Sequence, residues 1–183
     1  MKETQFERID RILGKSKDST RDDNIQCWFD FLNKELIFQI EVTGIEDFKW
    51  EEMYLFKPQL EEEYEELKQK QPSYTDIFIL KGIDIDNDSE WMLHPYEDIS
   101  ASVVRKNDGK EFVLGLSELE VINKKESSYQ TLNDYAVFFC NYLRLKQYII
   151  SITIQSSENF TSFRNCPVKI ESGFALASRR SYM

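Results

Sequence analysis

The feature of this sequence that most constrains its fold is a β-hairpin signal near the middle of the chain. Asn107-Asp108-Gly109 separates two runs rich in apolar and β-branched residues, 99–105 and 111–116. An Asp-Gly pair between two such runs favours a tight turn, because both residues tolerate the backbone conformation that the turn needs. The sequence therefore predicts two antiparallel strands here, and a fold that contains an antiparallel sheet.

Helical periodicity predicts several helices around this hairpin. Apolar residues recur every three or four positions in residues 6–13, in a second segment from about 23 to 34, and in 129–145. Gly14 is expected to end the first of these helices. Pro58 is expected to begin a further helix, whose outer face consists of glutamates.

Three other segments are expected to be strands, and one is expected to be extended. Residues 36–42 alternate between apolar and polar side chains, which is typical of a strand with one buried face. Residues 75–83 and 149–154 are also rich in β-branched residues. The aromatic segment 50–56 is expected to be extended.

The order of these elements predicts the α+β class, with a compact, mostly antiparallel β-sheet or small barrel flanked by several α-helices. A chain of 183 residues suits one domain with an appendage. We expect residues 1–145 to form a single domain with an N-terminal helix, and residues 146–183 to form a C-terminal extension whose structure the sequence does not predict.

Net charge excludes several classes of partner. The formal charge is −10, so nucleic acid and anionic membranes would repel the surface. No run of about eighteen apolar residues is present, so no membrane-spanning helix is expected. The first residues are polar and lack the apolar core of a secretory signal, which favours a cytoplasmic protein.

The cysteines lead to the same expectation. Cys27, Cys140 and Cys166 are odd in number and widely spaced, which argues against a disulfide framework and fits a reducing compartment. No Cys-x-x-Cys occurs, so a structural zinc site is not expected.

Catalytic motifs are missing from the sequence. His94 is the one histidine, and Pro95 follows it directly. His-Glu-x-x-His, Walker A and Gly-x-Gly-x-x-Gly patterns are absent. Paired carboxylates alone can hydrolyse glycosides, but such enzymes need a cleft in a scaffold that is normally larger. We therefore predict a non-enzymatic protein.

Acidic residues alternate with other residues from Asp84 to Glu90, and this is the pattern with coordination chemistry. Alternate acids in a turn can point at one centre, and calcium takes six to eight oxygen ligands. The segment is not an EF-hand, because Ser89 and Pro95 stand where that loop needs glycine and glutamate. The candidate ligands are Asp84, Asp86, Asp88 and Glu90, and the alternative is an acidic surface turn between two strands.

A second acidic segment covers residues 46–66, with nine acids against Lys49 and Lys57. Crowded carboxylates repel one another, and a divalent cation would relieve that repulsion. The alternative is a solvated helix face. The candidate ligands in this segment are Glu46, Asp47, Glu51 and Glu52.

Three segments resemble the CcbP calcium-binding proteins. They are Trp28–Phe38, Lys110–Glu120 and the helix Tyr129–Tyr142, so the resemblance covers about residues 24–145. Gln39 and Gly115 stand where that family has prolines, and residues 146–183 have no counterpart. The resemblance implies a small acidic protein whose compact sheet is wrapped by helices, and which binds calcium through surface carboxylates.

We therefore predict a cytoplasmic calcium-binding protein, either a buffer or a sensor, that binds Ca²⁺ through surface carboxylates. The same charge distribution supports an alternative, an acidic interaction module that neutralises a basic protein partner without a metal.

Overall fold

The structure is a computed structural model, and it describes residues 3–14, 21–55 and 57–154. Its centre is a five-stranded antiparallel sheet in the order β4-β3-β2-β1-β5. The strands are β1 (Glu41–Gly44), β2 (Phe78–Asp84), β3 (Ser100–Arg105), β4 (Glu111–Gly115) and β5 (Leu119–Val121). The α+β class is confirmed. The sheet is open, with β4 and β5 at its edges, so the alternative of a small barrel is wrong.

The predicted hairpin is formed by β3 and β4. Ser100 pairs with Gly115 and Val104 with Glu111, and the turn between the strands includes Gly109 at φ 74°. This positive φ is the reason that glycine suits the position.

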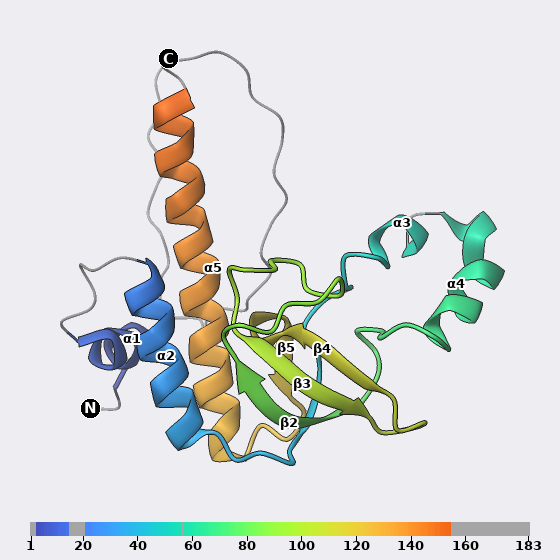
Figure 1. The fold of residues 1–183 in the computed structure, drawn as a ribbon, viewed down its shortest axis with the longest axis horizontal. Coiled ribbons are helices and arrows are strands. Elements are labelled where there is room, and N and C mark those ends of the chain that lie inside the picture. Colours follow the sequence, from blue (N-terminus) through green and yellow to red (C-terminus); the bar gives the residue numbers. More distant parts are fainter. Residues whose placement is uncertain (1–2, 15–20, 56, 155–183) are drawn as a thin grey trace, which may run out of the picture.

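Three helices stand together beside the sheet (Figure 1): α1 (Gln5–Leu13), α2 (Arg21–Glu35) and α5 (Ser127–Ile154). Trp28 of α2 is fully buried between them, with its ring 5.5 Å from that of Tyr135 and 5.4 Å from that of Phe138. The predicted helices over 6–13 and 23–34 are confirmed, and Gly14 follows α1 at φ 52°.

Residues 45–77, which join β1 to β2, form an arm whose two ends pack against the sheet and whose middle stands away from it (Figure 1). The arm contains α3 (Glu52–Leu55), the 3₁₀ turn η2 (Pro58–Leu60) and α4 (Glu61–Lys68). A second 3₁₀ turn, η3 (Leu116–Glu118), joins β4 to β5. The helix predicted to begin at Pro58 is thus present as η2 and α4.

Several predicted segments differ from the structure. The strand expected over 36–42 begins only at Glu41, because Gln39 has φ 71° and interrupts the extended backbone. The segment 50–56, expected to be extended, contains the helix α3. The strand expected over 149–154 is the end of α5. A short apolar run fits either type of element, and here the preceding helix continues through it.

The expectation of a chain without disulfides is wrong at Cys140. This residue of α5 is disulfide-bonded, whereas Cys27 of α2 keeps a free thiol. Cys166 lies outside the described residues. One reason for expecting a reducing compartment is therefore lost.

The domain division at residue 145 stays a prediction. Helix α5 crosses that position without a break, and residues 155–183 of the expected extension lie outside the described part of the chain. None of the described helices combines the length and the apolar composition needed to span a bilayer.

Candidate functional site

The first predicted ligand set lies in the acidic loop, residues 84–98, which joins β2 to β3. Asp84 and Asp88 each accept a backbone hydrogen bond from within the loop through one carboxylate oxygen. The Asp86 N–H donates to Asp84 Oδ1 at 3.0 Å, and the Tyr96 N–H donates to Asp88 Oδ1 at 2.7 Å. The Ser89 hydroxyl donates to the carbonyl of Val113 and so fixes the loop to the edge strand β4. The loop is therefore tied to the sheet, while Asp84, Asp86 and Glu90 remain exposed and Asp88 is half-buried.

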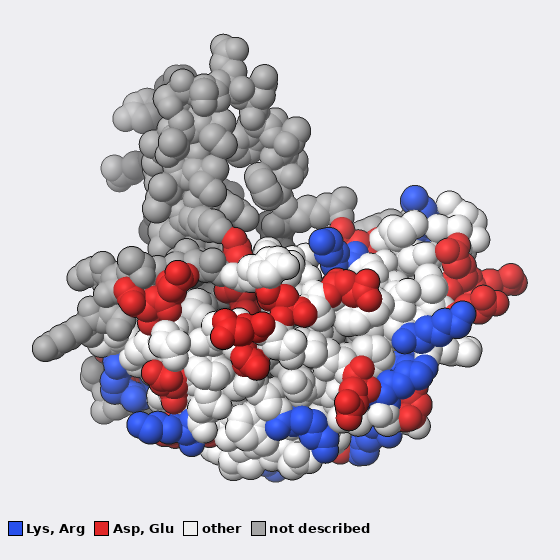
Figure 2. Space-filling view, in the orientation of Figure 1, with Lys and Arg blue, Asp and Glu red and all other residues white. Residues whose placement is uncertain are grey.

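The four predicted ligands of this loop have no cationic partner in the described ranges of the chain. Within the part of the chain that the structure describes, Asp84, Asp86, Asp88 and Glu90 form no ion pair, although Arg8, Arg105 and Lys106 pair with acids elsewhere. Figure 2 shows acidic side chains gathered on this face of the molecule, where Figure 1 draws the loop. These four side chains therefore concentrate negative charge without an ion-pair partner among the described residues.

The loop acids do not form a ready-made cage. Among residues 3–14, 21–55 and 57–154, no group of three or more His, Cys, Asp or Glu side chains comes together as an ion-binding cluster. The assignment of Asp84, Asp86, Asp88 and Glu90 as ligands stays a prediction.

The second predicted ligand set lies at the start of the arm. Glu46 and Glu52 are exposed and Asp47 is half-buried. Partial burial raises the pKa of Glu46, and the negative charge of Asp47 adds to this rise. Their assignment as ligands also stays a prediction.

Glu51 has a different role, because it is fully buried and its carboxylate accepts four hydrogen bonds. Oε1 accepts from the Tyr64 hydroxyl at 2.9 Å and from the Ser73 hydroxyl at 2.7 Å. Oε2 accepts from the Phe48 N–H at 3.0 Å and from the Tyr74 N–H at 3.0 Å. Two donors on each oxygen occupy the lone pairs that an ion would need. The structure therefore argues against Glu51 as a calcium ligand, and it makes this residue the centre of the base of the arm.

Asp98, the last residue of the acidic loop, and Glu118 of η3 bring two further carboxyl groups together. A Cβ placed on Gly115 would lie 2.3 Å from Glu118 Oε1 and 2.7 Å from Asp98 Oδ2, so both oxygens crowd the same point. The Leu93 N–H, in the acidic loop, donates to Glu118 Oε1 at 2.8 Å. Glu118 therefore lies directly against the loop.

Asp98 is held mainly by the core. Its Oδ2 accepts from the backbone N–H and the hydroxyl of Ser117, at 3.0 and 2.7 Å, and its Oδ1 accepts from the Tyr135 hydroxyl. Glu118 has fewer partners. Among the described residues, its side chain accepts one hydrogen bond, from the Leu93 N–H to Oε1. Of the two acids, Glu118 has more free acceptor capacity for a cation.

Burial raises the pKa of both acids. The pKa of Asp98 rises to about 6, although the hydrogen bonds from Tyr135 and Ser117 oppose the rise. The pKa of Glu118 rises to about 8; burial is the main cause and the nearby charge of Asp98 adds to it. Lys49 and the Leu93 N–H lower it only in part. At neutral pH Glu118 therefore mostly holds a proton.

Sequence reasoning missed this pair because its partners are distant along the chain. Glu118 follows β4 and Asp98 precedes β3, and neither has a local spacing that marks an oxygen site. Only the antiparallel pairing of β3 with β4 brings Gly115 opposite Ser100 and so places the two acids together.

Comparison with known proteins gives a likeness to solved structures only. No family model matches this chain, and no curated protein matches its sequence. One similar structure is called "Calcium binding protein in the calcium-binding form"; it is 13% identical, covers 76% of this chain and 92% of its own, and has a TM-score of 0.49. Another is called "The crystal structure of Anabaena CcbP"; it is 12% identical, covers 70% of this chain and 86% of its own, and has a TM-score of 0.45.

Proposed function

We propose that this chain is a cytoplasmic calcium-binding protein, a buffer or a sensor, and that it binds calcium at the acidic loop. The observation that carries the proposal is the lack of any described ion pair at Asp84, Asp86, Asp88 and Glu90, although the chain pairs acids elsewhere. A hard divalent cation would neutralise these charges, and its preferred ligands are carboxylate and carbonyl oxygens and water.

The donor chemistry of the loop fits calcium. Asp84 and Asp88 use Oδ1 for the backbone of the loop, which orients each carboxylate and leaves Oδ2 to face a cation. Glu118 lies against the same loop, and it adds a further oxygen donor once calcium displaces the proton that it holds at neutral pH. No three His, Cys, Asp or Glu side chains among the described residues are already arranged to hold an ion. Calcium binding therefore has to draw the loop acids together, and we expect weak to intermediate calcium affinity.

The first residues of the arm are a secondary candidate. Glu46, Asp47 and Glu52 keep the acidic character that motivated their selection, and Glu51 is removed from the set because its oxygens are occupied.

Titration calorimetry with calcium and with magnesium tests this function. We expect the parent chain to bind calcium more tightly than magnesium, with a dissociation constant on the order of 10⁻⁵–10⁻³ M. The double variant Asp86→Ala, Asp88→Ala should lose about tenfold or more in calcium affinity. The control, Glu62→Ala with Glu66→Ala, removes the same charge from the arm and should bind as the parent does. No heat at millimolar calcium would end the proposal.

A further inference from the structure

Helix α4 is an exposed element with no buried face of its own. None of its residues is buried, and its main neighbour is the short turn η2 rather than the sheet or the long helices. Figure 1 shows it at the end of the arm, away from the rest of the fold. A helix of eight residues is unstable by itself in water, so other parts of the chain have to hold it.

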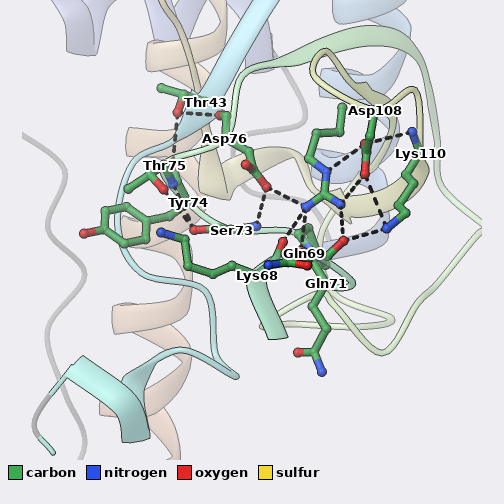
Figure 3. Close-up of polar contacts among 12 residues, drawn as sticks. Thr43, Lys68, Gln69, Gln71, Ser73, Tyr74, Thr75, Asp76, Asp108 and Lys110 are labelled. Carbon is green, nitrogen blue, oxygen red and sulfur yellow. Dashed lines mark hydrogen bonds and ion pairs between the residues drawn. The ribbon is translucent and has the colours of Figure 1, made fainter. Parts of the chain in front are cut away.

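Arg105, at the end of β3, holds the C-terminal end of α4. Its side chain is 2% exposed, and its guanidinium donates to the carbonyls of Lys68 and Gln71 at 2.8 Å and of Gln69 at 3.0 Å. Asp76 and Asp108 fix the guanidinium through ion pairs of 3.1 and 2.7 Å. Figure 3 shows these carbonyls and carboxylates turned toward one point. The carbonyls that a helix end leaves without partners are therefore bound by the hairpin.

Aromatic rings hold the middle of α4. The rings of Tyr54 and Tyr64 stack at 5.7 Å, and Trp50 lies 5.7 Å from Tyr64. The indole N–H of Trp50 donates to the carbonyl of Pro72 at 2.7 Å, and the Tyr64 hydroxyl donates to Glu51 Oε1 at 2.9 Å. With Arg105 at its C-terminal end and this cluster against Tyr64 in its middle, α4 is held in a defined position although none of its residues is buried.

The exposed surface of α4 is acidic, and apolar side chains of the arm lie next to it. Five glutamates, all exposed, share α4 with one cation, Lys68, and that lysine pairs with Glu65 at 3.5 Å. Met53 in α3 is 51% exposed, and the stacked rings of Tyr54 and Tyr64 are half-buried. Figure 2 shows the acidic side chains gathered at the end of the molecule where Figure 1 draws α4.

We propose that the arm is a docking element for a Lys/Arg-rich segment of a partner protein, with Glu61, Glu62, Glu63, Glu65 and Glu66 of α4 as its charged surface. Charge complementarity selects this occupant, because the carboxylates pair with cationic side chains and would repel nucleic acid or anionic lipid. The aliphatic stems of lysine and arginine can lie on the exposed Met53. This function goes beyond calcium binding and does not depend on it.

Fluorescence anisotropy with a labelled peptide in which lysine and alanine alternate tests the proposal. The full chain is used with a chelator present, so that failure of calcium binding and failure of docking are distinguished. We expect binding that weakens as the salt concentration rises from about 50 to about 200 mM, because the contacts are exposed. The counterpart peptide with glutamate in place of lysine should not bind.

Two matched variants locate the binding on the arm. Glu62→Lys with Glu66→Lys reverses two charges on α4, whereas Asp30→Lys with Glu35→Lys makes the same charge change on exposed positions of α2. The arm variant should lose about tenfold or more in peptide affinity and the α2 variant should retain affinity within about twofold. Glu62→Gln with Glu66→Gln, a milder change, should give an intermediate loss.

Three results would overturn this inference. They are absence of peptide binding by the parent chain, equal losses in the arm and α2 variants, and a self-association in sedimentation that the arm variant abolishes. Equal losses would mean that only net charge matters, and self-association would mean that a second copy of the chain is the occupant.

Discussion

The titration of Glu118 illustrates how a single side chain links the fold to pH. Its pKa is 4.5 as an ordinary glutamate and about 8 in the folded chain, because its carboxyl group is largely removed from solvent beside Asp98. The folded state thus binds a proton that the unfolded state releases between these two values. The stabilisation from this group is complete below about pH 4.5 and is lost as pH rises through about 8.

Glu118→Gln should therefore reduce the pH dependence of stability. Glutamine keeps the acceptor for the Leu93 N–H but never becomes charged beside Asp98. We expect its urea midpoint, measured with a chelator present, to fall less than that of the parent between pH 5 and pH 9, so that the variant is the more stable protein at pH 9. Parallel curves for the two proteins would show that Glu118 does not titrate in this range.

Arg105 is the residue whose geometry matters most for the arm. Its planar guanidinium donates to three carbonyls and two carboxylates, and lysine cannot reproduce that fork. Arg105→Lys should cost about 3 kcal/mol of unfolding free energy, because buried acceptors are left without donors. Chemical denaturation measures this cost.

The control for Arg105 is the same substitution at an exposed ion pair. Arg11 pairs with Glu3 at 2.9 Å, and both side chains are largely in solvent. Arg11→Lys should change the unfolding free energy by less than about 1 kcal/mol. A similar small effect at Arg105 would contradict its role in holding α4.

At the scale of an element, the end of β4 needs a residue without a side chain. A Cβ at Gly115 would meet Glu118 Oε1 at 2.3 Å and Asp98 Oδ2 at 2.7 Å, so Gly115→Ala has to push the carboxyl pair apart. We expect a loss of about 1–3 kcal/mol in unfolding free energy. Gly82→Ala in β2 is the control, because no atom lies within 4 Å of its added Cβ and its φ is not positive. Equal unfolding free energies of the two variants would show that Asp98 and Glu118 can move apart without loss of stability.

At the scale of the whole molecule, calcium binding should appear as thermal stabilisation. A ligand that binds only the folded chain adds about 2.7 kcal/mol at about a hundred times its dissociation constant. For a chain of this size that corresponds to a rise in Tm of about 5–10 °C. Scanning calorimetry with calcium, and again after a chelator is added, measures the rise and its reversal. An unchanged Tm at saturating calcium would contradict binding to the folded state alone.

The sequence by itself determined the elements with strong local patterns. The Asp-Gly turn at 108–109 predicts the β3–β4 hairpin, and the periodic apolar residues predict α1, α2 and the first part of α5. Predictions from the sequence fail where the local preference for a helix or a strand is weak, or where the rest of the fold overrides it. The three-residue strand β5 is too short to leave a pattern, Gln39 interrupts an alternating run, and the segment 149–154 continues a helix.

The tertiary structure alone decided the role of each carboxylate. Glu51 and Glu52 are neighbours in the sequence, yet four donors from the arm surround Glu51 while Glu52 faces solvent. Asp98 and Glu118 are twenty positions apart, yet strand pairing brings them together. The physical reason is that helices and turns depend on near neighbours along the chain, whereas the donors, charges and solvent around an acid come from segments that meet only in the folded protein.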